Sequence, residues 1–440
     1  MDEDFCMTIR ARFKRGTILL LLFLSWAWLI GATWSRVPFW PDADGYTSHV
    51  AEGRWVAHPP GYLLFVLAGH AFHLLGLPAY PAVQAASLLF TLGALPLLYR
   101  LFRRVCRPET ALLLVAAFTF SWNVLLLSRT GTSHAGDFFS VSLLLLLATS
   151  PGLRAGQTGT CLAYGSAVVL CAGLRLTTAI MMVPLFLAVL LRNWKKANVW
   201  IAYVLAGLTV LALQLTVIRL SGGWEAYGSY SQAMHQVNRP SSIVLSGVNG
   251  ATLLNIGRAF GWWGLSLSFL LLLPAAAIFR SRISTAASRS GWLAALHSDP
   301  QKTDVLLYGA LSALGCLGMA ASYLCTHPGY ISAALPGTFA CIAVFASLAS
   351  PRLTWAIFGV YFVTTLAFFL LVRPFPRPAG AFQAAANGLL LQYTGHAVKN
   401  SLFKTTSVWL RDSGLEELVP ENRKADLDRE ARQKEATSRP

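Results

Sequence analysis

Long apolar runs recur along almost the whole of this 440-residue chain, and they restrict its fold more than any other feature. A helix needs about 20 mostly apolar residues to cross a bilayer, and it satisfies its backbone hydrogen bonds internally. Besides the run from 17 to about 34, such runs begin near Ala82, Thr110, Phe138, Gly159, Leu176, Asn198, Phe260, Val305, Ile331 and Leu353. With 55% hydrophobic and 12% charged residues, the chain is too apolar for a soluble class. We predict an all-α polytopic bundle of about eleven transmembrane helices.

The apolar run from Tyr62 to Leu77 is shorter than the others and is closed by Pro78 and Pro81. We predict that it forms a juxtamembrane helix that lies on the membrane surface. The domain prediction is a catalytic bundle at 1–372, with a first external loop and juxtamembrane helix at 35–81 and a long external loop at 221–258, followed by a partly interfacial, partly helical or disordered tail at 373–440.

Basic residues are distributed unequally between the two sides that this count of spans defines. The side of the N-terminus carries 17 Lys and Arg residues, and the opposite loops carry 7. Because basic residues accumulate in cytoplasmic loops, the N-terminus is predicted to be cytoplasmic. The net charge of +16 therefore needs no nucleic-acid partner, and no basic stretch interleaved with aromatics suggests one.

The opposite, extracytoplasmic side collects the polar residues that are able to do chemistry. It faces the outside of a bacterial inner or plasma membrane, or the lumen of the endoplasmic reticulum in a eukaryote. The predicted loops on this side hold Asp42, Asp44, His49, Glu52, His58, Arg129, His134, Asp137, Arg175, Trp224, Glu225, His235, Arg239, His327 and Tyr330. Ionisable groups at a membrane boundary are costly unless they have a function. We therefore expect the active site on this face.

The first external loop contains the densest group of such residues. Asp42 and Asp44 precede Tyr46, and the segment His-Pro-Pro-Gly-Tyr at 58–62 opens the juxtamembrane helix. These residues resemble the first loop of the GT-C superfamily of membrane glycosyltransferases, in particular the protein O-mannosyltransferase and aminoarabinose-transferase type. The similarity continues through Trp122 and the polar run at 128–137, and it covers roughly the first 180 residues.

The resemblance implies inverting transfer of a sugar, hexosyl or mannosyl in type, from a polyprenyl-phosphate donor to a protein, lipid or glycan acceptor. It also implies a catalytic carboxylate in the first external loop. Asp44 is the predicted base that takes the proton of the acceptor hydroxyl, with Gly45 allowing a tight turn beside it. Asp42 would share that role, bind the acceptor or hold a divalent cation.

The departing phosphate requires positive charge where negative charge develops. Arg175, predicted between two apolar spans, is the first candidate, because a guanidinium grips phosphate oxygens in a bidentate manner; anchoring of a helix end by snorkelling is the alternative. Arg129, His58 and His327 are the supporting candidates. The segments His-Pro-Pro-Gly-Tyr at 58–62 and His-Pro-Gly-Tyr at 327–330 are alike, and each would open a helix on the outer side.

The remaining predicted substrate-binding residues are Tyr46, Glu52, His134, Asp137 and Tyr330. A structural polar cluster is the alternative for Arg129, His134 and Asp137. The loop at 221–258 would be an acceptor-binding lid or a plain connection.

Metal binding has little support in the sequence. Two carboxylates can ligate Mg²⁺ or Mn²⁺, but no clear third ligand accompanies Asp42 and Asp44, and the seven cysteines show no metal spacing. We predict no cofactor. The competing functional class is a transporter or flippase of a lipid-linked sugar, or a non-catalytic relative that binds one. Transporters tend to place polar groups on broken helices near the midplane, whereas here they gather at one boundary.

Overall fold

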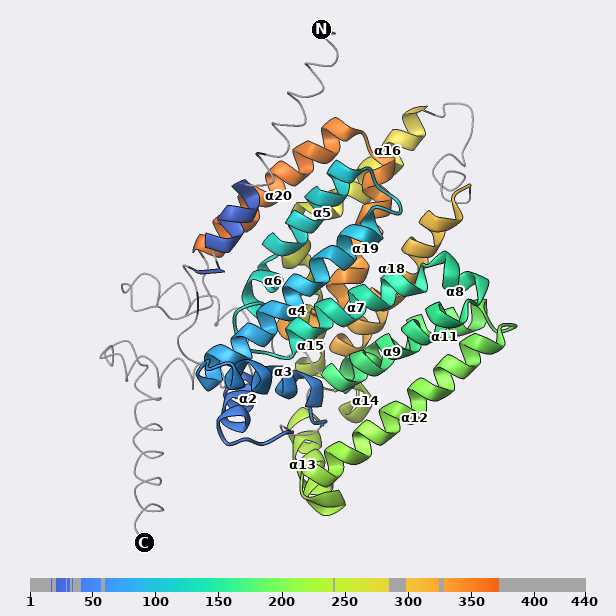
Figure 1. The fold of residues 1–440 in the computed structure, drawn as a ribbon. Coiled ribbons are helices and arrows are strands. Elements are labelled where there is room, and N and C mark those ends of the chain that lie inside the picture. Colours follow the sequence, from blue (N-terminus) through green and yellow to red (C-terminus); the bar gives the residue numbers. More distant parts are fainter. Residues whose placement is uncertain are drawn as a thin grey trace.

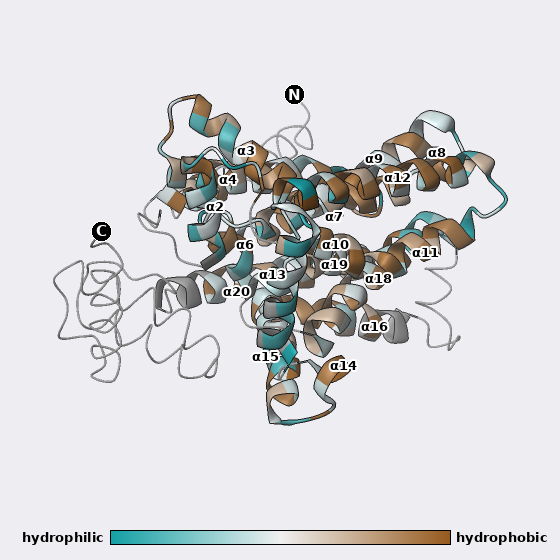
Figure 2. Cartoon of the chain, turned by 90° about the horizontal axis from the view of Figure 1, so that it is seen from below, coloured by the Kyte–Doolittle hydropathy of each residue, from teal (hydrophilic) through white to brown (hydrophobic). Residues whose placement is uncertain are grey.

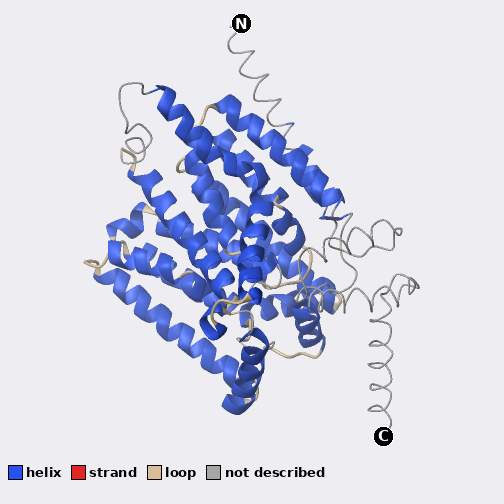
Figure 3. Ribbon diagram, turned by 180° about the vertical axis from the view of Figure 1, so that it is seen from behind, coloured by secondary structure: helices blue, strands red, loops and turns tan. Residues whose placement is uncertain are grey.

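The computed structural model of the protein describes residues 41–56, 60–239, 242–284, 298–323 and 328–371, together with part of the stretch 17–34. All regular elements in these residues are helices, and no strand occurs among them (Figure 3). The predictions for His58, His327 and the tail at 373–440 lie outside the described residues.

Each later apolar run corresponds to a helix that begins within a few residues of the predicted position, except that the run near Phe260 starts earlier. These helices are α4 (Ala79–Phe102), α5 (Pro108–Phe120), α7 (His134–Ala148), α9 (Thr158–Leu174), α10 (Leu176–Met181) with α11 (Val183–Arg192), α12 (Ala197–Leu220), α15 (Gly250–Leu267) with η2 (Ser268–Leu271) and α16 (Leu272–Ser284), α18 (Pro300–Ser322), α19 (Ala334–Leu348) and α20 (Pro351–Leu371). Shorter elements are α2 (Pro41–Ala51), α3 (Leu63–Leu74), α6 (Trp122–Leu127), α8 (Pro151–Ala155), α13 (Gly223–Asn238), α14 (Ile243–Ser246) and η3 (Pro328–Ile331).

Four stretches in the described part of the chain are long and apolar enough to cross a membrane: α4, α12, residues 250–278 and α18. Six further apolar helices, α3, α5, α7, α9, α11 and α19, are shorter. Figure 2 shows hydrophobic colour along α9, α11, α12 and α18, whereas α13 is paler and more polar. The predicted all-helical membrane bundle is confirmed.

Glycines allow close approach of helices in the middle of the bundle. A Cβ atom on Gly337 of α19 would lie 2.5 Å from the carbonyl oxygen of Gly309 in α18, and one on Gly315 would clash with the carbonyl oxygen of Met181. Real Cβ atoms do not approach so closely, so only glycine fits. α18 therefore packs directly against both α19 and the α10–α11 pair.

At the end of the bundle predicted to be cytoplasmic, Asp304 joins three helices. This buried carboxylate of α18 pairs with Arg154 of α8, and its Oδ1 atom lies 2.7 Å from Arg192 Nη2 of α11. In the sequence, the basic residues here served only to assign the side of the membrane. Two of them also tie helices together through one acid.

We expect Asp304→Asn to lower the free energy of unfolding by about 2 kcal/mol, less than a fully buried pair would lose, because both arginines are partly exposed. Thermal unfolding of the purified protein measures the loss. An unchanged midpoint would contradict the structural role of Asp304.

The opposite end carries α2, α3 and α13 (Figure 1). α3 packs against α2, α4 and α9. Leu74, its last residue, and Leu75, which follows it, are both exposed. Its position agrees with the predicted juxtamembrane helix. The predicted long loop at 221–258 is largely helical, because α13, α14 and the start of α15 fall within it.

Candidate active site

The segment predicted as a tight loop around Gly45 is the helix α2 instead. Pro41 occupies its first position, and Asp42 and Asp44 lie in its first turn, where acids favour helix initiation. Residues two apart on a helix point to nearly opposite sides, whereas residues four apart share a face. Asp42 therefore shares the face of the fully buried Tyr46, and Asp44 lies on the exposed side.

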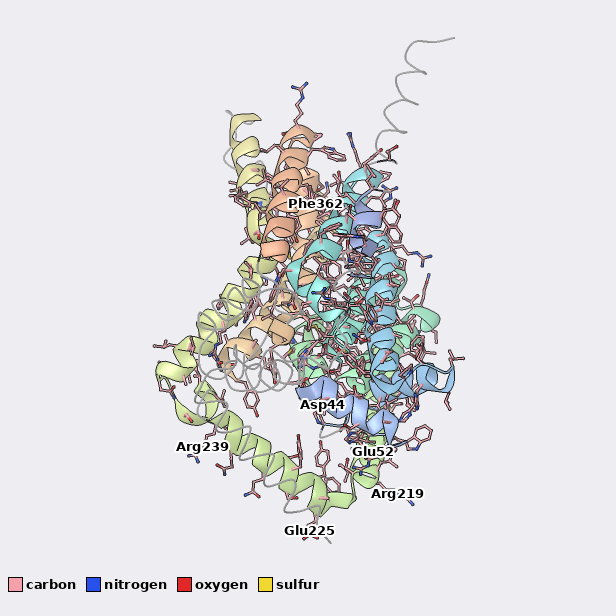
Figure 4. All side chains as sticks on the ribbon, turned by 90° about the vertical axis from the view of Figure 1, so that its left-hand side faces the viewer. Asp44, Glu52, Arg219, Glu225, Arg239 and Phe362 are labelled. Atoms are coloured by element: carbon pink, nitrogen blue, oxygen red, sulfur yellow. The ribbon has the colours of Figure 1, made fainter. Side chains whose placement is uncertain are left out.

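The charge of Asp42 acts on residues from four parts of the chain: Tyr46 of α2, Tyr62 before α3, His134 of α7 and Tyr230 of α13. Asp42 is half-buried on the side of α2 that faces these residues. Figure 4 labels Asp44 on α2 and shows α13 at the same end of the molecule. Of the two predicted carboxylates, Asp42 thus faces the interior.

Tyr46 fixes α2 to the polar run that precedes α7. Its hydroxyl oxygen lies 2.9 Å from Ser133 Oγ, and its ring packs edge-on against Tyr62 and Phe65. Burial raises the pKa of Tyr46 well above its usual value, and the nearby carboxylate of Asp42 adds to this effect. Tyr46 is therefore a neutral phenol at neutral pH.

Tyr62 adopts a left-handed backbone conformation, with φ 49° and ψ 35°, directly before α3. For a residue with a side chain this costs about 1–2 kcal/mol, and such strain concentrates at functional sites. Gly61 before it has φ 110° and touches Val217 of α12, so no side chain fits there. Burial raises the pKa of Tyr62 to about 12, and its hydroxyl is in hydrogen-bond contact with Arg175.

Asp137 and Arg175 form a buried ion pair beneath α2 and α3. Arg175 Nη1 donates to Asp137 Oδ2 over 2.9 Å. The hydroxyls of Thr178 and Ser332 donate to the same carboxylate over 2.6 and 2.5 Å. An ion pair removed from water needs such additional donors to be stable, so Asp137 is held in place by three side chains.

Tyr330 and His134 complete this cluster. The Arg175 guanidinium carbon lies 5.6 Å from the centre of the Tyr330 ring, a cation–π distance. The ring of His134 lies edge-on to Tyr330 at 5.7 Å, and His134 Nδ1 is 3.7 Å from Asp137 Oδ2. The Pro-Gly-Tyr segments that ended the two similar sequence motifs thus place Tyr62 and Tyr330 against the same guanidinium.

One donor of Arg175 is available. Its Nε atom is buried and has no hydrogen-bond partner among the described residues. Buried N–H groups are nearly always paired, so a guanidinium with an open donor suggests an acceptor ligand. The predicted supporting residue Arg129 is fully buried in the segment before α7. Its backbone carbonyl accepts a hydrogen bond from Gln84 Nε2 at 2.7 Å.

Glu52 is not part of this cluster. It lies just beyond the C-terminal end of α2, is exposed, and pairs with Arg54, which is more exposed still, at 2.8 Å. Thr178, Ser332 and Ser133 were missed by the sequence analysis. Their hydroxyls carry no signal in a sequence so rich in serine and threonine, although Ser133 lies within the polar run that was singled out.

The described residues contain no group of three or more His, Cys, Asp or Glu side chains arranged for a metal ion. Asp42 and Asp44 also project from opposite sides of α2, so they do not form one ligand pair. Independence from metal stays a prediction.

No family model and no curated protein matches the sequence. Solved structures with the same fold include ArnT from Cupriavidus metallidurans bound to undecaprenyl phosphate, at 16% identity and a TM-score of 0.55. The apo state of that protein matches at 16% identity with a TM-score of 0.53. Both alignments cover 92% of this chain and 73% of the ArnT chain. At this identity the likeness shows the fold, and the GT-C-like membrane bundle that the resemblance implied is confirmed at that level.

Proposed function

We propose that this chain is a GT-C-type membrane glycosyltransferase that moves a sugar, with inversion, from a polyprenyl phosphate to an acceptor on the extracytoplasmic side. A shared fold carries many activities, so the function has to be inferred from the site. The observation that carries it is the buried guanidinium of Arg175, which has an open Nε–H donor among the described residues and lies in one cluster with Asp42.

Arg175 supports binding of the donor phosphate. Asp137 and the two tyrosines hold its guanidinium in a fixed orientation, which leaves its remaining donors for an anion. A preorganised donor is most effective where charge develops during bond cleavage and water is excluded. The ArnT structure with undecaprenyl phosphate adds a precedent for a polyprenyl phosphate in this fold.

Asp42 replaces Asp44 as our proposed base. Asp44 is exposed, whereas Asp42 faces the tyrosines that surround Arg175. In the proposed step the acceptor hydroxyl oxygen attacks the anomeric carbon while the bond from that carbon to the phosphate oxygen breaks. The carboxylate of Asp42 takes the hydroxyl proton, and the phosphate leaves with the electron pair of the broken bond beside Arg175.

The sugar and the acceptor follow from the resemblance alone. We propose a hexose of mannose type as the sugar and a protein, lipid or glycan as the acceptor.

The N-terminus is predicted to be cytoplasmic from the charge distribution. This prediction would put α2 and Arg175 at the extracytoplasmic boundary, where a lipid-linked donor is accessible.

Mass spectrometry of glycosylated material from cells with and without the gene tests the proposal, and it identifies the sugar and its attachment. We expect one glycan signal to disappear without the gene and to return with the wild-type chain. An unchanged glycan profile, together with movement of a lipid-linked sugar across vesicles by the purified protein, would favour the transporter alternative.

A further inference from the structure

The turn at 328–332 meets the proposed site with three of its residues. Tyr330 contacts Arg175 and His134, and Ser332 donates to Asp137. The third residue, Gly329, contributes only its backbone, which lies directly against the imidazole of His134.

Gly329 has no room for a side chain. A Cβ atom there would lie 2.5 Å from His134 Cδ2, 2.6 Å from Nε2 and 2.7 Å from Cγ. Real Cβ atoms essentially never come this close, so either the ring or the turn would have to move. The backbone of Gly329 is not in the left-handed region, and its glycine is therefore needed for space and not for conformation.

The imidazole of His134 has little freedom to move away. Its side chain is 1% exposed, Tyr330 packs on it edge-on, and Asp137 lies 3.7 Å from its Nδ1 atom. Any displacement of the ring would therefore disturb the residues around Arg175.

We propose that Gly329 is a positioning residue: by presenting bare backbone to His134, it fixes the imidazole beside the Asp137–Arg175 pair in the geometry that receives the donor phosphate. This inference rests on the proposed function. It extends that function to a residue that contributes no side chain, and it explains why a glycine precedes Tyr330 in the second of the two similar motifs.

The test is a double-mutant cycle on the full-length protein in nanodiscs, with undecaprenyl phosphate as the probe. We expect Gly329→Ala to weaken binding roughly tenfold, within the range for residues in contact. His134→Ala removes the ring that the new methyl group would strike. Adding Gly329→Ala to His134→Ala should then cost little more than His134→Ala alone. Gly318→Ala, where an added Cβ meets nothing within 4 Å, is the matched control and should bind as the wild type.

Thermal unfolding of the four proteins of the cycle, without Gly318→Ala, reports the contact without any ligand. Gly329→Ala should lower the midpoint in the wild-type background and hardly at all in the His134→Ala background. Independent effects of the two substitutions on binding, or wild-type affinity in Gly329→Ala, would overturn the positioning role. Failure of the wild type itself to bind undecaprenyl phosphate would refute the proposed function, and the unfolding cycle would still decide whether Gly329 fixes His134.

Discussion

Asp42→Asn is expected to reduce sugar transfer by about 10²–10⁴-fold, the contribution usual for a general base. Asparagine keeps the size and one carbonyl oxygen of the side chain, but it cannot take the proton of the acceptor hydroxyl. The protein should still insert and bind undecaprenyl phosphate, because Arg175 is untouched. The measurement is the transfer rate at saturating donor, once mass spectrometry has identified the sugar.

Asp44→Asn is the matched control, since it makes the same chemical change two residues away on the exposed side of α2. We expect it to retain nearly full activity. A collapse of transfer in Asp44→Asn with little effect of Asp42→Asn would return the base to Asp44. Equal, small effects of both would argue for a protein that binds or moves the lipid-linked sugar without transferring it.

The sequence alone could not predict which of Asp42 and Asp44 faces the site. The acidic pair could be found from its place after the first span, but choosing between its members required the phase of α2. Read as a loop, the segment allowed Gly45 to turn either carboxylate toward the site. As a helix begun by Pro41, it directs the two carboxylates apart by about 200°.

The helical bundle was predictable because the hydrocarbon core of a membrane permits few backbone structures. Long apolar runs in the sequence therefore indicate the helices directly. The site was predictable in part for the same reason: alternation of spans assigned His134, Asp137, Arg175 and Tyr330 to one boundary, and the structure brings all four into contact. Alternation gives a side of the membrane and no distances. The contribution of Ser332, which comes from a turn 195 positions after Asp137, depends on tertiary packing.

Arg175→Lys is expected to reduce transfer and the affinity for undecaprenyl phosphate by about 10²–10³-fold, as for loss of a preorganised donor. Lysine keeps the positive charge near Asp137, so the buried carboxylate keeps a partner. It loses the planar fork of donors that contacts Asp137 and Tyr62 and that would bind the donor phosphate in the proposed site. If Arg175 were only an anchor that snorkels to the interface, lysine would replace it with little loss.

Measurements of stability distinguish a role of Arg175 in phosphate binding from a role in folding. Arg175→Ala should destabilise the protein by about 3–5 kcal/mol, since it leaves Asp137 charged and buried without its partner. Combining it with Asp137→Ala removes the orphaned charge and should restore much of the unfolding midpoint, while undecaprenyl phosphate still fails to bind. Recovery of binding in the double variant would mean that the pair serves only to hold α7 and α9 together, and that the phosphate is received elsewhere.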